Sequence, residues 1–218
     1  MPATGCVAVF GGSGNTGREV VAAALRTGLR VRALYRPGSE PREVPVGLEV
    51  LTGQLTAPED VRRTLEGTIG AICVYGPRLG RKVTNPEVFC EAATANMVSG
   101  MKRLGIERLI CQTGAMAGGN SPNWSGFVRC FVRRYWRLYP AIDADRDAQE
   151  RVVKGSGLNW TLVRPFRISG ARGKGRVQAA PSARITAFTN VRRTDLAEFL
   201  VGELPAGRFH RQVVYVVS

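Results

Sequence analysis

The sequence predicts an α/β fold in which a doubly wound parallel sheet carries helices on both faces. Three observations support this prediction. Apolar strand-like runs alternate with amphipathic helical stretches, the first strand runs directly into a glycine-rich turn, and no low-complexity linker interrupts the alternation. Because a chain of 218 residues builds one such core, we expect residues 1–218 to form a single domain.

The first half of the chain supplies four of the predicted strands. Short apolar runs that end in glycine or polar residues predict strands at 6–10, 30–35, 48–51 and 70–75. Helical patterns follow at 16–27, from residue 56 onward, and from Asn85-Pro86 to about residue 104, where Gly105 closes the helix. For the second of these helices, Thr56 is the predicted cap, Pro58 fits the first turn and Glu59 completes a capping box.

The second half repeats the alternation with longer connections. Strands are predicted at 109–113, 160–163 and 213–217, and helices at 143–154 and 194–204. Thr194 or Asp195 is the predicted cap of the last helix. Two connections, near 114–142 and 169–190, follow predicted strands. Since ligands bind at the carboxyl ends of parallel strands, we expect both to be insertions on the substrate side.

Composition limits the kinds of site. The five cysteines form no Cys-x-x-Cys pair and His210 is the one histidine, so we expect neither a metal site nor a disulfide framework. No apolar run approaches the roughly 18 residues that cross a bilayer, and the chain starts without a secretory pattern. We therefore expect a cytoplasmic protein without a membrane partner. A net charge of +14 favours acidic ligands, although a solvated arginine-rich surface explains it more simply than nucleic-acid binding does.

The turn after the first strand carries the clearest functional motif. Three glycines have the spacing G-x-x-G-x-x-G between an apolar strand and an amphipathic helix. The first permits a tight turn, the second lets the backbone approach a diphosphate, and the third lets the helix pack on the strand. The helix start then offers N–H groups and a positive dipole end to phosphates. The predicted cofactor contacts of this Rossmann-type turn are Gly11, Ser13, Gly14, Asn15, Thr16 and Gly17.

The end of the second strand predicts which dinucleotide is bound. Sites that prefer NAD place Asp or Glu there, about 20 residues after the turn, to bind the ribose hydroxyls. This chain has Arg36, with Arg32 and Ser39 nearby and no acid before Glu40. A guanidinium pairs with a 2′-phosphate through two hydrogen bonds. NADP(H) is therefore the predicted cofactor, and a plain surface role for Arg36 is the alternative.

With these residues the chain resembles the atypical short-chain dehydrogenase/reductases, and within them the NmrA-like and biliverdin-IXβ reductase (flavin reductase) branch. The resemblance covers nearly the whole chain except 118–139 and 171–181. It implies cofactor contacts at Gln54, Leu55, Tyr75, Gly76, Thr113 and Pro165. The motifs that carry it, besides the glycine turn and Arg36, are Gly53-Gln54-Leu55, Tyr75-Gly76-Pro77-Arg78, Gln112-Thr113-Gly114, residues 156–165 and residues 191–197.

The departures from the family concern catalysis. Members often carry a Tyr-x-x-x-Lys pair in which the tyrosine donates a proton; here Ile142 and Arg146 occupy the two positions, and the pair is absent. If hydride transfer occurs, the proton comes from Thr113 or solvent, with Arg167 or Arg78 polarising the acceptor. Reductases of the biliverdin and flavin type also lack the pair, so its loss does not exclude reduction.

The segment Trp124–Tyr139 is rich in arginine and aromatic residues. A helical reading places Phe127, Phe131 and Tyr135 on one face, which Val128, Val132 and Tyr139 widen. A stripe of three arginines, 129, 133 and 137, lies on the opposite side. One interpretation is a lid that stacks on a planar acidic substrate. A second is a helix packed on the sheet with solvated arginines, and a third is contact with nucleic acid or an anionic membrane.

The function predicted from these features is NADPH-dependent reduction of a small planar molecule, such as a quinone, a flavin or a natural-product intermediate. The alternatives are a non-catalytic NADP(H) sensor that binds a protein partner, as NmrA-like regulators do, and a non-redox isomerase or cyclase on the same scaffold. A homodimer is compatible with the sequence, which names neither the substrate nor the proton donor.

Overall fold

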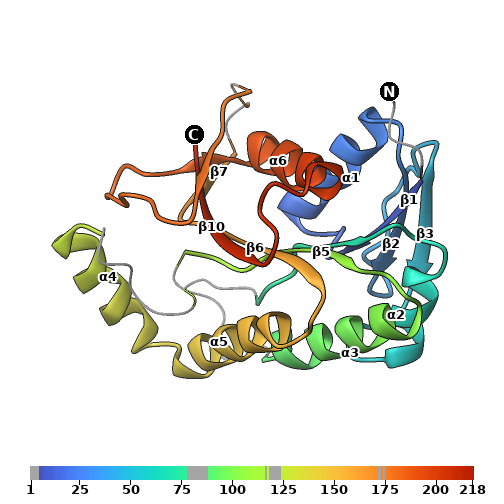
Figure 1. Cartoon of the computed structure of the whole chain (residues 1–218), viewed down its shortest axis with the longest axis horizontal. Coiled ribbons are helices and arrows are strands. Elements are labelled where there is room, and N and C mark those ends of the chain that lie inside the picture. Colours follow the sequence, from blue (N-terminus) through green and yellow to red (C-terminus); the bar gives the residue numbers. More distant parts are fainter. Residues whose placement is uncertain (1–4, 78–87, 116, 118–123, 171–172, 174) are drawn as a thin grey trace.

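The computed structural model describes residues 5–77, 88–115, 117, 124–170, 173 and 175–218. A twisted sheet lies between two layers of helices (Figure 1). In chain order its elements are β1 (Cys6–Phe10), α1 (Asn15–Arg26), β2 (Arg30–Tyr35), β3 (Leu48–Thr52), α2 (Pro58–Leu65), β4 (Ala71–Cys73), α3 (Cys90–Arg103), β5 (Arg108–Gln112), α4 (Gly126–Trp136), α5 (Pro140–Lys154), β6 (Asn159–Pro165), β7 (Ile168–Ser169), β8 (Gln178–Ala180), β9 (Val191–Arg192), α6 (Arg193–Ala206) and β10 (Gln212–Val217).

The strand order confirms the doubly wound α/β prediction. Within the described residues the main sheet runs β3-β2-β1-β4-β5-β6-β10-β8, and all neighbours are parallel except β8, which pairs antiparallel with β10. The order reverses between β1 and β4, so the crevice outside the carboxyl ends of these two strands is the expected ligand site. Phe10 pairs with Leu34 on one side and Cys73 on the other, which aligns the carboxyl ends of the three strands there.

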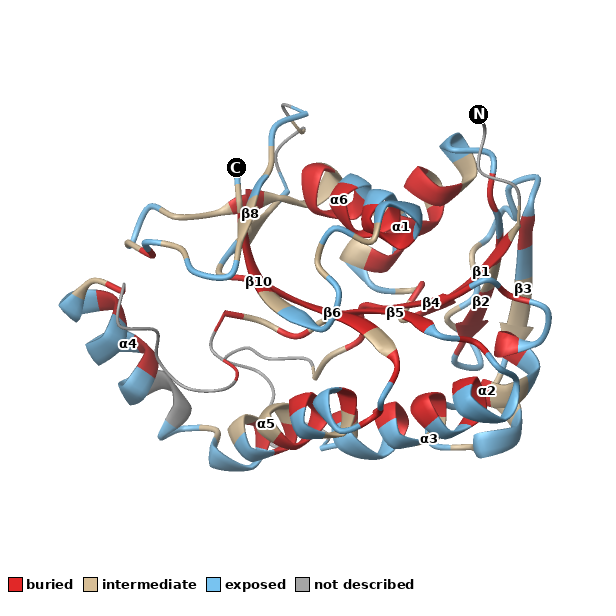
Figure 2. Cartoon of the chain, in the orientation of Figure 1, coloured by how far each residue is buried: buried red, intermediate tan, exposed pale blue. Residues whose placement is uncertain are grey.

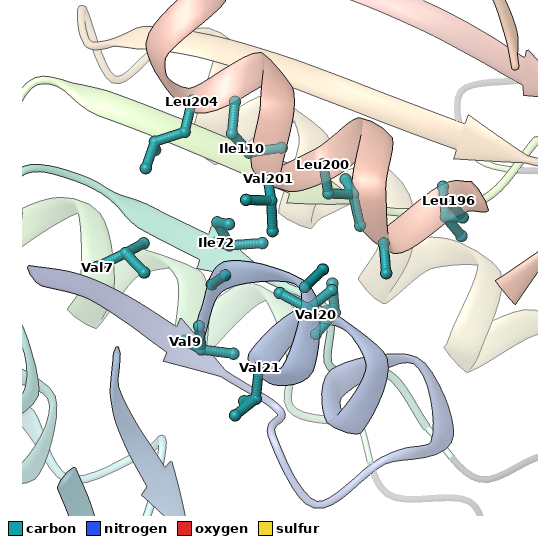
Figure 3. Packing of buried hydrophobic residues seen from close by; sticks show 14 of the residues in the cluster. Val7, Val9, Val20, Val21, Ile72, Ile110, Leu196, Leu200, Val201 and Leu204 are labelled. Atoms are coloured by element: carbon teal, nitrogen blue, oxygen red, sulfur yellow. The ribbon is translucent and has the colours of Figure 1, made fainter. Parts of the chain in front are cut away.

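Two apolar layers hold the helices on the sheet. On one face, β1, β4 and β5 contribute Val9, Ile72 and Ile110, which pack against α1 and α6 (Figure 3). On the other face, α2, α3 and α5 cover Phe10, Cys73 and their neighbours. The central strands are buried on both faces, as Figure 2 shows, and they therefore read as continuous apolar runs in the sequence.

A third, smaller apolar cluster joins α4 to the end of the sheet. Its buried members include Trp124, Val128, Val132, Ile185 and Tyr215. Trp124 forms a parallel bridge with Ile185, and the Ser125 N–H donates to the Ile185 oxygen at 3.1 Å. The two connections predicted as insertions therefore meet beside β10, although they are separated by about 60 residues in the sequence.

The predicted helix starts need correction. Ala57, not Thr56, is the N-cap of α2, and α6 starts at Arg193 with Arg192 as its cap, in place of Thr194 or Asp195; neither helix has a side-chain cap. Phe89 is the N-cap of α3, which starts at Cys90; Asn85 and Pro86 lie outside the described residues.

A partner from another helix explains where α3 begins. Asp145 of α5 accepts hydrogen bonds from the Cys90 and Glu91 N–H groups, both at 2.9 Å. A carboxylate at this end also favours the helix dipole. The cap comes from 55 residues away, so no local pattern could have predicted it.

Candidate cofactor and substrate site

The first and last glycines of the turn between β1 and α1 leave no room for a side chain. Gly11 has a φ of +95°, and a Cβ there would lie 2.8 Å from the Tyr75 nitrogen after β4. A Cβ on Gly17 would overlap the backbone oxygen of Gly11. A Cβ on Gly14 would have the Gly11 oxygen as its nearest neighbour, 3.4 Å away, which is an ordinary contact distance. The protein thus packs tightly around both ends of the turn and leaves space above its middle.

The start of α1 presents unsatisfied backbone donors. Its N-cap is Gly14, in extended backbone, and no described side chain caps it. The first helical N–H with a carbonyl partner belongs to Arg18, which donates to the Gly14 oxygen at 3.0 Å. The first turn holds no acidic residue. Free N–H groups at the positive end of a helix dipole, above a glycine with open space, fit the diphosphate of a dinucleotide.

Arg18 is a residue of this site that the sequence prediction missed. Its Nη1 donates to the Ser13 oxygen at 2.8 Å and its Nη2 to Oδ1 of Asn15 at 2.6 Å, so the guanidinium lies beside the turn. A cation in the first turn is repelled by the helix dipole. An arginine there without an acidic neighbour in that turn is therefore itself a signal for an anionic ligand.

The end of β2 lies next to the turn. Arg36 is exposed, and its backbone oxygen accepts hydrogen bonds from the Ser39 nitrogen at 2.9 Å and the Ser39 hydroxyl at 2.8 Å. The Tyr35 ring is buried with its hydroxyl 3.1 Å from the position of a Cβ on Gly12. Burial raises the pKa of Tyr35 despite the opposing charge of Arg18, which also places Arg18 near this strand end.

Arg32 and the residues that follow β3 are held by contacts within the protein. Arg32 pairs with Glu49 at 2.8 Å. After β3, the Gln54 N–H donates to Oδ2 of Asp60 at 2.9 Å, and a Cβ on Gly53 would overlap the same carboxylate. Gln54 is exposed, while Leu55 is half-buried, and its oxygen accepts a hydrogen bond from the side chain of Asn96 at 3.3 Å. The predicted contacts at 54 and 55 are thus held by α2 and α3.

An arginine of α5 lies beside the end of β4. The Tyr75 side chain points into the core, where its hydroxyl pairs with Oγ1 of Thr94 at 2.6 Å. The backbone oxygen of Tyr75 accepts a hydrogen bond from Nη1 of Arg146 at 3.3 Å, and a Cβ on Gly76 would overlap the Arg146 guanidinium. The only atoms of residues 75 and 76 that can reach a ligand at this edge are therefore those of the backbone, with Arg146 beside them.

Arg146 occupies the position of the family's lysine, and Ile142 that of its tyrosine. Ile142 is 1% exposed, so the tyrosine position holds a buried aliphatic side chain. Arg146 keeps a positive charge at the lysine position. The sequence prediction treated the pair as lost; in the structure the cationic half is kept in another form.

Thr113, at the end of β5, is part of a buried ionic network. Its hydroxyl donates to Oε1 of Glu150 at 2.8 Å, and the same carboxylate accepts a hydrogen bond from Nε of Arg164 at 2.8 Å and pairs with Lys154 at 3.0 Å. Burial alone would raise the pKa of Glu150, but Arg164 and Lys154 outweigh it and the net pKa is lowered. Glu150 is thus a carboxylate that engages the one proton of Thr113, which leaves that hydroxyl as an acceptor toward the site.

Two of the remaining predicted residues, Arg167 and Pro165, make structural contacts. Arg167 is exposed, and its Nη1 donates to the Ala187 oxygen at 3.0 Å, so it supports the 184–190 loop. Pro165 ends β6 and accepts a backbone hydrogen bond from Ala115 at 2.9 Å. Arg78 lies outside the described residues.

Helix α4 buries only part of the face that the sequence prediction described as apolar. Val128 and Val132 are 2% exposed, whereas Phe127 and Phe131, predicted on the same broad face, are 73% and 58% exposed. Figure 2 shows the helix with one buried side at the end of the molecule. The helix therefore packs by its valines and turns phenylalanines outward.

In the described part of the chain, no helix is long and apolar enough to cross a membrane. The same residues contain no group of three or more His, Cys, Asp or Glu side chains arranged for a metal ion.

Comparison with known proteins agrees with this geometry. The model of the NAD(P)H-binding family matches residues 11–205. A curated chloroplastic protein of Arabidopsis thaliana is 23% identical over 180 residues, 80% of this chain. The chain spans 63% of that relative's length and 33% of another's.

Solved structures show the same fold. The anaerobilin reductase ChuY from Escherichia coli superposes with a TM-score of 0.79 at 19% identity, covering 99% of this chain and 97% of that one. A short-chain dehydrogenase/reductase from Veillonella parvula, in complex with NADP, gives a TM-score of 0.80 at 16% identity over 98% of this chain and 94% of that one. This chain belongs to the NAD(P)H-binding family.

Proposed function

We propose that the protein is an NADPH-dependent reductase of a small, planar, anionic molecule. The observation that carries the substrate class is that two long stretches after strands β5 and β6 contain arginines and no acidic residue. The sequence has no Asp or Glu between Glu107 and Asp143, and none between Glu150 and Asp195. These two stretches include α4 and the 184–190 loop, which meet at Trp124 and Ile185. Glu150, beside the end of β5, is buried and paired with Arg164 and Lys154, so the arginines of the two stretches attract anions and raise their local concentration.

The preference for NADPH rests on two arginines. Arg36 follows β2, where an acid would select NAD, and Arg18 lies between the glycine turn and the same strand end. Together they supply positive charge next to the adenosine side of the predicted dinucleotide. A 2′-phosphate would be favoured there over a bare hydroxyl.

The chemistry needs little from the protein besides orientation and charge. Bound NADPH supplies a hydride to the acceptor. Arg146 holds a fixed positive charge at the end of β4, where it favours the negative charge that develops on the acceptor. Thr113 accepts a hydrogen bond, because its proton is engaged by Glu150. With Ile142 in place of the tyrosine, the proton comes from solvent.

The candidate substrates are planar ring systems. One fold relative is named an anaerobilin reductase, and flavins and quinones share flat, conjugated acceptors with such molecules. The test is NADPH oxidation, followed at its absorbance band, with acceptors chosen in pairs that share a ring and differ in charge. Flavin mononucleotide against riboflavin, and a bilin diacid against its dimethyl ester, are two such pairs. We expect the charged member to be reduced with the lower KM.

Two matched charge reversals test whether Arg36 makes the protein prefer NADPH over NADH. Arg36→Glu should weaken NADPH about tenfold or more relative to NADH, a change of about 1.4 kcal/mol. Arg30→Glu makes the same charge change at the other end of β2 and should leave the ratio unchanged. If NADPH binds but no acceptor of the panel accelerates its oxidation, the reductase proposal is wrong, and an unchanged NADPH/NADH ratio in Arg36→Glu removes the role of that arginine.

A non-catalytic sensor of NADP(H) is the second candidate. The buried Ile142 at the tyrosine position favours it, because no side chain there can donate a proton. A sensor would bind NADP⁺ and NADPH without turnover and would recruit a protein partner according to which form is bound. Equal retention of a partner with both forms would exclude sensing.

A further inference from the structure

We propose that the outer side of α4, together with the 184–190 loop, docks the protein on an anionic lipid bilayer. The sequence led us to expect no membrane partner, although contact with an anionic membrane was one of three interpretations of the 124–139 segment. The structure shows which side of α4 faces out. With Val128 and Val132 packed inward, Phe127 is 73% exposed and Leu138, just after the helix, is 71% exposed. Phe127 is the second residue of α4 and Leu138 lies in the turn that follows the helix, so exposed apolar side chains stand at both ends of α4.

The cations of α4 lie beside these apolar side chains. Arg129, Arg133, Arg134 and Arg137 are all exposed, and none of them forms an ion pair within the described part of the chain. No acidic residue stands in the sequence between Glu107 and Asp143 to neutralise them. The surface thus combines apolar side chains and uncompensated guanidinium groups.

The neighbouring loop extends the same surface. Phe188 is 89% exposed and lies three residues after Ile185, which bridges to Trp124 at the start of α4. Figure 1 places α4 and this loop at the same end of the molecule, beyond the edge of the sheet. Arg167 braces the loop through its hydrogen bond to the Ala187 oxygen. Two segments therefore offer exposed phenylalanines at one end of the fold.

This combination fits a bilayer better than other polyanions. Phenylalanine and leucine enter the boundary between headgroups and acyl chains, while arginines remain at the level of the phosphates. Nucleic acid would pair with the arginines but gives Leu138 no apolar environment. A bilayer accommodates both sets at once. The surface lies on the outside of α4, so this inference stands apart from the cofactor turn and does not depend on turnover.

Flotation with lipid vesicles tests the proposal. The full chain is mixed with vesicles of phosphatidylcholine alone, or of phosphatidylcholine with phosphatidylglycerol, at physiological ionic strength. We expect binding to the second kind only. Phe127→Ser with Leu138→Ser should reduce it about tenfold, whereas Val44→Ser with Val46→Ser, which changes two exposed apolar side chains elsewhere, should not.

The charge control compares two variants that lose the same number of positive charges. Changing arginines 129, 133 and 137 to Gln should abolish binding, and changing arginines 30, 42 and 103, also exposed, to Gln should leave most of it. Far-ultraviolet circular dichroism and NADPH affinity show that each variant is folded.

Equal loss in both arginine variants, or equal binding to neutral vesicles, would overturn the proposal. So would the absence of vesicle binding in a protein that binds duplex DNA through the same arginines, since the surface would then be a nucleic-acid site. Loss of vesicle binding with unchanged NADPH affinity in the α4 variants separates this proposal from cofactor binding at the glycine turn.

Discussion

Arg146 donates a hydrogen bond from Nη1 to the backbone oxygen of Tyr75, 3.3 Å away, and so ties α5 to the end of β4. The same Nη1 lies 2.7 Å from Oε1 of Gln149, whose Nε2 donates to Oγ1 of Thr94 at 3.1 Å. Thr94 in turn pairs with the hydroxyl of Tyr75. The chain of hydrogen bonds starts and ends on Tyr75. The protein therefore fixes the position of the Arg146 charge before any ligand binds, which is the condition for electrostatic preorganisation.

The first prediction concerns Gly76 and Arg146. A Cβ at Gly76 would displace the guanidinium, the far end of a flexible side chain, so Gly76→Ala should act through Arg146 and leave the fold intact. We expect Gly76→Ala and Arg146→Ala each to reduce kcat/KM with NADPH about tenfold, and the double variant to be no worse than Arg146→Ala. Additive losses would show that Gly76 acts independently of Arg146. Partial recovery in Arg146→Lys would identify charge as the property that matters.

The second prediction concerns the glycine turn. Because a Cβ on Gly17 would overlap the Gly11 oxygen, Gly17→Ala should distort the turn and abolish measurable dinucleotide binding in calorimetry. Gly202 in α6 is the matched control, since a Cβ there meets nothing within 4 Å. Gly202→Ala should raise the free energy of unfolding by about 0.5–1 kcal/mol and leave binding unchanged. Normal affinity in Gly17→Ala would exclude this turn as the diphosphate site.

The third prediction concerns the pH dependence of stability. Glu150 and Arg164 are 2% and 7% exposed, so Glu150→Gln should lower the free energy of unfolding at neutral pH by about 3–5 kcal/mol, because it leaves a buried guanidinium unpaired. Glu66→Gln, which breaks an exposed pair with Arg62, should cost under about 1 kcal/mol.

The sign of the pH effect follows from the lowered pKa of Glu150. Its carboxylate stabilises the fold above the pKa that glutamate has in the unfolded chain, and this contribution is lost as pH falls through the lower native pKa. Urea unfolding of both proteins from neutral to acidic pH should therefore show the difference between wild type and Glu150→Gln shrinking in acid. A difference independent of pH would contradict an ionised Glu150.

The fourth prediction concerns thiol reactivity. Four of the five free cysteines are buried, and Cys130 on α4 is exposed. Burial raises the pKa of Cys90 to about 12, which removes thiolate at neutral pH. A colorimetric thiol reagent should titrate one thiol in the native protein and five in denaturant. Cys130→Ser should leave the native protein unreactive, and rapid reaction of a second thiol would show that a core strand or helix opens.

Much of the fold follows from local sequence. The strands predicted at 6–10 and 30–35 have the same bounds in the structure. The first is buried throughout and is therefore an uninterrupted apolar run, whereas the second begins with alternation, with Arg30 and Arg32 more exposed than Val31 and Ala33. The predicted helix 16–27 begins one residue earlier, at Asn15, and ends at Arg26. The short strands β7, β8 and β9 were missed, since two or three residues carry no detectable period.

Periodicity predicted that α4 is amphipathic and placed its valines and phenylalanines on one broad apolar face. A helical pattern indicates which residues share a face, but not which of them meet the rest of the protein. Val128 and Val132 are buried because they pack in one cluster with Ile185, which lies far along the chain.

The sequence by itself determined the alternation of strands and helices, the glycine turn with its open helix start, the arginine after the second strand, and the stretches without acidic residues. These are local properties of composition and spacing. Only the tertiary structure decided that Arg18 lies beside the turn, that Arg146 stands at the end of β4, and that Glu150 engages the proton of Thr113. The physical reason is that a hydrogen bond joins atoms brought together by packing. Thr113 and Glu150 are 37 positions apart in the sequence, and no local pattern specifies the distance between them in space.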